Sequence, residues 1–127
     1  MLGKRMEFGG TGIFHALNLL ESCDMEKADE EDYEWAERKF EEYLPVPDIF
    51  APAYATKGIS FFTEYGYKFF KEAIDILSTL FIDYCEEAGL GELSEISMEI
   101  PDEMIVFKDE HQFVILEKDF ALLKARQ

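Results

Sequence analysis

The sequence predicts an α+β domain: helices in the N-terminal two-thirds, then a three-stranded antiparallel meander and a short C-terminal helix. Two observations lead to this class. Apolar residues recur with a helical period up to Ala88, and after Gly89 and Gly91 the period changes to two. Hydrophobic residues make up 48% of the chain, which is enough for a folded core.

The first two helices are expected on either side of a polar break at residues 23–28. Residues 12–22 read as a short helix, with Thr11 as its N-cap. Asp29 or Asp32 can cap a second helix that ends near Leu44, before the prolines that follow. In a helical projection its apolar residues form one stripe, and Trp35 lies nearly opposite that stripe.

One long central helix is expected over about 64–88. Thr63 opens the periodic run, and Gly89 is a natural residue to end it. The apolar positions cover more than half of the circumference, so this helix should be enclosed. Gly66 weakens the first turn, which allows a later start.

The meander follows from three apolar segments in the last third. Ile96, Met98 and Ile100 alternate with polar or charged residues, as in a half-buried strand. Residues 104–107 and 113–116 are apolar runs separated by a polar turn, which predicts a hairpin. Residues 119–126 read as the terminal helix. Residues 45–62 read as irregular chain, with one extended segment at 59–62.

The chain is strongly acidic, with 28 Asp+Glu against 12 Lys+Arg and a net charge of −16 in 127 residues. This charge argues against direct binding of nucleic acid or of an anionic membrane. No apolar run is long enough to span a membrane, and no signal peptide is visible. We therefore expect one cytoplasmic domain over residues 1–127, and the sequence leaves open whether residues 1–8 are ordered or disordered.

The charge is concentrated in two segments. Residues 21–48 contain 12 acids against 3 bases, and residues 83–119 contain 12 acids against 2 bases. The block 49–82 between them has no net charge and holds 9 of the 19 aromatic residues. The charge is thus a property of particular surfaces.

Few residues suggest catalysis or cofactor binding, and we expect no enzyme, no metal and no cofactor. Gly9-Gly10-Thr11-Gly12 precedes a helix but lacks the lysine of a phosphate-binding loop. His15 and His111 are the only histidines, and no motif places a nucleophile beside them. Cys23 and Cys85 do not form a zinc pattern; a reducing compartment favours free thiols, although a bridge stays open.

The acidic residues have two interpretations: a solvated face that gives solubility, or a recognition surface. Carboxylates four residues apart on a helix sparsely imitate the phosphates of a nucleic-acid strand. Such a surface suits a groove that normally binds nucleic acid, and an exposed Trp among acids is a typical interface anchor. The predicted partner-binding residues are Glu30, Glu31, Glu34, Trp35, Glu37, Glu41, Glu42, Glu95, Glu99, Asp102 and Glu103.

The leading hypothesis is a non-enzymatic binding protein that inhibits a basic, nucleic-acid-handling protein. In composition the chain resembles phage or mobile-element inhibitors of nucleases and defence systems, and immunity proteins that neutralise toxic nucleases. That resemblance covers no particular residues. One alternative is an acidic secretion-chaperone-like protein, acting as a homodimer, whose aromatic block 49–82 offers grooves to a client polypeptide. Another is a small enzyme that uses His15 with a nearby acid.

Overall fold

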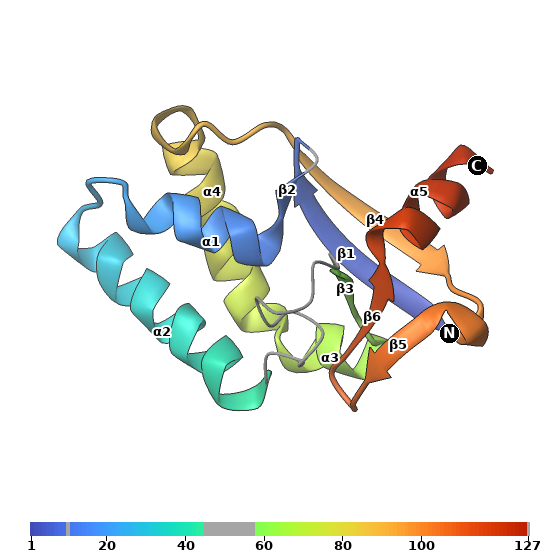
Figure 1. Cartoon of the computed structure of the whole chain (residues 1–127). Coiled ribbons are helices and arrows are strands. Elements are labelled where there is room, and N and C mark those ends of the chain that lie inside the picture. The colour runs from blue at the N-terminus through green and yellow to red at the C-terminus, as the bar shows by residue number, and fades with distance from the viewer. Residues whose placement is uncertain (10, 45–57, 127) are drawn as a thin grey trace, which may run out of the picture.

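The structure is a computed structural model that describes residues 1–9, 11–44 and 58–126. It is an α+β fold in which helices lie to one side of an antiparallel sheet and one further helix lies at its other end (Figure 1). The elements in chain order are β1 (Leu2–Phe8), β2 (Thr11–Gly12), α1 (Ile13–Glu21), α2 (Lys27–Tyr43), β3 (Gly58–Phe62), α3 (Glu64–Phe69), α4 (Lys71–Ala88), β4 (Leu93–Glu99), η2 (Asp102–Met104), β5 (Ile105–Lys108), β6 (Gln112–Leu116) and α5 (Glu117–Ala125).

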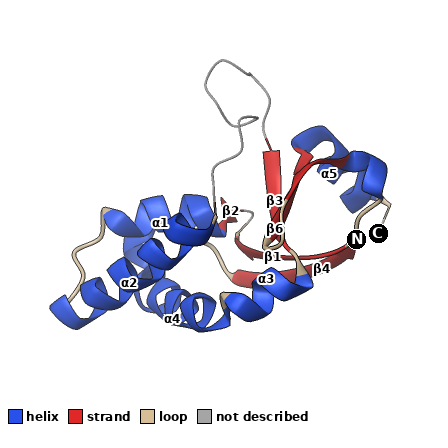
Figure 2. Cartoon of the chain, turned by 90° about the horizontal axis from the view of Figure 1, so that it is seen from below, coloured by secondary structure: helices blue, strands red, loops and turns tan. Residues whose placement is uncertain are grey.

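The sheet consists of two parts joined at one point. Strand β1 pairs with β4 along its whole length, from Leu2↔Glu99 to Phe8↔Leu93. Strand β3 pairs with β6, which in turn pairs with β5. Between the two parts, β1 and β3 share the single pair Lys4↔Phe62. Figure 2 shows the result: β3 and β6 rise steeply from the curve formed by β1 and β4.

The predicted three-stranded meander is wrong. The strands over 93–99, 105–108 and 112–116 exist, but β4 pairs with β1 and not with its neighbour in sequence, β5. The sheet that the structure describes has six strands because β1, β2 and β3 complete it. Residues 1–8, for which the sequence left disorder open, contain the strand against which β4 is ordered. Only the hairpin between β5 and β6 has the predicted pairing.

The single long helix over 64–88 is also wrong, because the run is divided into α3 and α4 at Phe70. Phe70 has φ −94° and ψ 7°, and its side chain is fully buried. Helix α3 is held to the end of the hairpin, where Thr63 N donates to the His111 carbonyl (3.0 Å). Helix α4 instead packs against α2, so the chain changes direction between these two attachments.

Gly66 explains why α3 can lie so close to the hairpin. A Cβ atom at this position would overlap the backbone carbonyl of His111. The sequence suggested that this glycine weakens the helix, but in the structure it permits a close approach of two backbones. At the other end, Gly89 ends α4 as predicted, with φ 72°.

Helices α1, α2 and α5 confirm the three other predicted helices, with small differences at their ends. Gly12 precedes α1 where Thr11 was expected, since Thr11 belongs to β2. Glu26 precedes α2, so the helix begins before both expected caps, Asp29 and Asp32. The apolar stripe of α2 is confirmed, because Tyr33, Ala36 and Phe40 are buried.

The core is divided between the two faces of the sheet. On one face, Met6, Phe8 and Phe62 pack with the buried sides of α1, α2 and α4. On the other face, Phe61 and Phe113 stack at 5.4 Å between ring centroids, beneath Phe120 of α5. The neighbouring residues Phe61 and Phe62 of β3 therefore point into different cores.

Candidate protein-binding surface

Helix α2 carries the larger group of predicted partner-binding residues. Eight of its 17 residues are acidic and three are basic. Five of the six predicted acids are exposed and Glu37 is half-buried. None of the eight forms an ion pair with a residue that the structure describes. The helix therefore presents uncompensated negative charge to solvent.

Trp35 lies at one side of this helix in a small aromatic patch, which we define as Trp35, Lys39, Tyr43, Tyr65 and Phe69. The Lys39 ammonium lies 5.7 Å from the Trp35 ring centroid and 5.0 Å from that of Phe69. Trp35 is 37% exposed and Tyr65 is 55% exposed. Trp35 is therefore partly exposed: Lys39 of the same helix lies over its ring, and more than a third of the residue is open to solvent.

The ring of Phe69 connects the patch to the interior. Its centroid is 4.8 Å from that of Tyr43 and 4.8 Å from that of His111, which is buried. Tyr43 and Tyr65, which are exposed, therefore pack against Phe69, whereas Trp35 is in contact with Lys39. An aromatic surface supported in this way needs little ordering when a partner binds.

The second predicted acidic region, over residues 92–103, lies elsewhere. Helix α2 and the η2 turn are at opposite ends of the molecule (Figure 1). Glu99 accepts a hydrogen bond from the Met1 ammonium (2.7 Å), and Asp102 is 3.6 Å from the same group. Glu95 is 3.8 Å from Lys4. The structure does not bring the two regions together, and it partly compensates the charge of the second, although Glu103 is exposed there.

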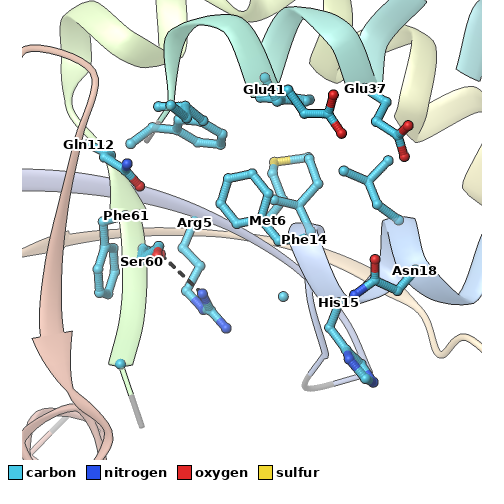
Figure 3. Close-up of a pocket in the computed structure, with 17 residues that line it drawn as sticks. Arg5, Met6, Phe14, His15, Asn18, Glu37, Glu41, Ser60, Phe61 and Gln112 are labelled. Atoms are coloured by element: carbon cyan, nitrogen blue, oxygen red, sulfur yellow. Dashed lines mark hydrogen bonds between the residues drawn. The ribbon is translucent and has the colours of Figure 1, made fainter. Parts of the chain in front are cut away.

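Glu37 and Glu41 lie on the edge of α2 that borders a pocket (Figure 3). Tyr33 OH donates to the Glu37 carboxylate (2.7 Å) and lies 3.2 Å from the Leu17 carbonyl. Burial raises the pKa of Tyr33 above its ordinary value, and the hydrogen bond to Glu37 raises it further. This edge of α2 is therefore ordered by contacts with α1.

The residues considered for catalysis are dispersed. His15 is exposed and lines the pocket, while His111 is buried in the turn between β5 and β6, near the rings of Phe69 and Phe70. Cys23 and Cys85 are both free thiols, and burial raises the pKa of Cys23. Of the glycine-rich segment, Gly10 lies outside the described residues. Gly12 is adjacent to the guanidinium of Arg5.

Sequence reasoning missed the ionic cluster on β1. Glu7 is 4% exposed, and its carboxylate accepts from Arg5 Nε (2.7 Å) and lies 3.5 Å from Lys124 Nζ. Arg5 and Glu7 are two residues apart, which is the spacing that places side chains on one face of a strand. This spacing indicates the pair only if residues 1–8 are treated as a strand.

Comparison with known protein families, with curated proteins and with solved structures finds no match to this chain. Among the helices that the structure describes, none has the length and apolar character needed to cross a membrane.

Proposed function

We propose that this protein is a non-enzymatic binding protein that docks onto a basic surface of a partner protein through helix α2. The observation that carries the proposal is that α2 bears acids without ion-pair partners among the described residues and, together with α3, forms an exposed aromatic patch. Solubility requires exposed charge but no exposed tryptophan. Aromatic anchors surrounded by polar residues are characteristic of protein interfaces.

The charge of α2 selects the class of partner. Exposed acids without intramolecular cations attract a positively charged surface and accelerate encounter with it. Within the described residues, three acids of the second region have a cation within 4 Å and none on α2 does. This difference supports α2, and not the region 92–103, as the contact surface.

A nucleic-acid-handling protein is the partner class that this surface suits best. Proteins that bind nucleic acid expose basic grooves shaped for a linear array of negative charges. The exposed acids of α2 form such an array along 17 residues of helix. Occupation of the groove would inhibit the partner by excluding its nucleic acid. As part of the same proposal, the two proteins meet in the cytoplasm, where the thiols of Cys23 and Cys85 stay free.

The aromatic block 49–82 was the basis of the chaperone alternative. In the described part of that block, Phe61, Phe62, Phe70 and Phe81 are buried, and Tyr65 is the aromatic residue that is mainly exposed. The exposed aromatic surface of residues 58–82 therefore belongs to the aromatic patch, and the exposed aliphatic residue Ile82 lies outside that patch on α4. Capture of an unfolded client through this patch, independent of salt, would be the outcome that favours the alternative.

The test is affinity capture from a lysate of the organism that encodes the chain, with matched baits. The variant Glu31→Lys, Glu34→Lys, Glu42→Lys reverses exposed charge on α2 and avoids the pocket. The control Glu86→Lys, Glu92→Lys, Glu103→Lys makes the same change in net charge at exposed positions elsewhere. A basic protein held by wild type and control, and lost by the α2 variant, supports the proposal. Identical capture by all three baits would refute it.

A further inference from the structure

A cavity of about 500 Å³ lies where β1 and β3 diverge. Its walls come from β1, the N-terminal half of α1, the C-terminal half of α2, β3 and the first residue of β6 (Figure 3). Cavities of this size are typical of small-molecule sites. Most of the lining is apolar, including Met6, Phe14, Leu17, Phe40 and Phe62.

Arg5 provides the one cationic guanidinium among the lining residues that the structure describes. Figure 3 shows it projecting into the pocket between Ser60 and His15. Its side chain is 12% exposed, with Nε bonded to Glu7 and Nη1 bonded to the Ser60 carbonyl (3.0 Å). The Nη2 atom lies beside Gly12 and has no acceptor among the residues that the structure describes. A hydrogen-bond donor pair is therefore available at this wall.

The charge of the cluster around Arg5 is not balanced. Glu7 contributes one negative charge, while Arg5 and Lys124 contribute two positive charges. Lys124 is half-exposed on α5 and does not line the pocket, whereas Arg5 is held inside it. Arg5 is therefore the cation of this cluster that can contact a molecule in the pocket, through the part of its guanidinium that Glu7 and Ser60 leave free.

We propose that this pocket binds a small organic monocarboxylate with an apolar body. Its carboxylate would accept hydrogen bonds from the free edge of the Arg5 guanidinium, whose planar donors match carboxylate geometry. Its apolar part would lie against Phe14, Phe40 and Phe62. Glu37 and Glu41 border the pocket from α2 and disfavour a second negative group, so dicarboxylates and phosphate esters should bind more weakly than monocarboxylates.

The proposal is tested by isothermal titration calorimetry with decanoate and with decanol, which share an apolar chain. The double variant Arg5→Met, Glu7→Gln removes both members of the buried pair and leaves the net charge unchanged. The control Lys124→Met removes the other cation of the cluster, outside the pocket. We expect decanoate affinity to fall about tenfold or more in the double variant and to change less than about twofold in the control. Decanol affinity should not change.

Two outcomes would overturn this assignment: no binding of decanoate to the wild type, or equal affinities of decanoate and decanol that the double variant leaves unaltered. If the double variant does not fold by circular dichroism, Gly12→Val replaces it. The backbone of Gly12 is extended (φ −71°, ψ 164°), a conformation that valine adopts, and the added side chain would overlap the Arg5 guanidinium and displace Nη2. Decanoate binding should weaken in this variant also. Raised salt should not weaken decanoate binding, whereas it should weaken binding of a basic partner to α2, so the two proposals fail separately.

Discussion

Arg5 and Ser60 join the two parts of the sheet. The Nη1 atom of Arg5 on β1 donates to the carbonyl of Ser60 on β3 at 3.0 Å, in a region where the two strands form no backbone pair. The same guanidinium bonds Glu7, so one side chain connects the strand, the buried carboxylate and the pocket. An arginine that looks like a solvated residue near the N-terminus is in this way a structural residue of the sheet.

Removal of Arg5 alone should destabilise the protein strongly. The substitution Arg5→Met leaves Glu7 buried with only the more distant Lys124 as a partner. We expect a loss of about 3 kcal/mol in the free energy of unfolding, because an uncompensated buried charge is costly. The double variant Arg5→Met, Glu7→Gln should recover at least half of that loss in urea denaturation. Equal stabilities of the single and double variants would contradict this prediction, because they would show that the Glu7 carboxylate becomes hydrated in Arg5→Met while the fold stays the same.

Gly66→Ala should be among the most damaging small substitutions. The added Cβ would overlap the His111 carbonyl. Because this is a backbone group, a change of side-chain rotamer cannot relieve the overlap. We expect a loss of about 3 kcal/mol in the free energy of unfolding. Gly89→Ala is the comparison, since it has open space but a φ of 72°, and should cost about 1 kcal/mol. Urea midpoints that rank the two variants in the opposite order would argue against the close approach of α3 and the hairpin.

Trp35→Ala should separate stability from binding. Trp35 is the only tryptophan and is 37% exposed, so its loss should cost less than about 1 kcal/mol in the free energy of unfolding. Affinity for the basic partner should fall by more than about 2 kcal/mol, as expected for an aromatic anchor. Leu122→Ala, at an exposed position on α5, is the control and should leave affinity unchanged. If both substitutions affect binding equally, the aromatic patch is not the anchor.

Tyr33 should make the protein sensitive to alkaline pH. Burial, followed by the hydrogen bond to Glu37, raises the pKa of Tyr33 in the folded state. Because the phenol ionises more readily in the unfolded chain, its contribution to stability is present below about pH 10 and is lost as pH rises beyond it. The midpoint temperature of thermal unfolding should therefore fall more steeply above that pH for the wild type than for Tyr33→Phe. Parallel curves for the two proteins would contradict this role.

The sequence predicted those elements whose signal is local. The stripe of α2, the end of α4 at Gly89 and the hairpin between β5 and β6 each depend on residues within one turn or one element. The pairing of β4 with β1 joins residues more than 80 positions apart, and no local pattern states it. For this reason the order of the strands could not be predicted from the sequence.

Strand β1 was missed for a different reason. Its two faces both carry charged residues: Lys4 on one, Arg5 and Glu7 on the other. Charge near a terminus is usually solvated, whereas here Arg5 and Glu7 compensate each other beneath α5. The pocket that Arg5 lines was not predicted either, because β1 forms part of its wall. The exposure of the α2 acids, in contrast, was predictable from a single helical projection.

The central claim, that α2 binds a basic protein, is tested most directly by the dissociation constant for the captured partner, measured at increasing ionic strength with the three proteins used as baits. Wild type and the control with reversals at Glu86, Glu92 and Glu103 should bind alike and weaken steeply with salt. The variant with reversals at Glu31, Glu34 and Glu42 should bind about a hundredfold more weakly at low salt. An affinity that is independent of salt and identical in all three proteins would contradict the account.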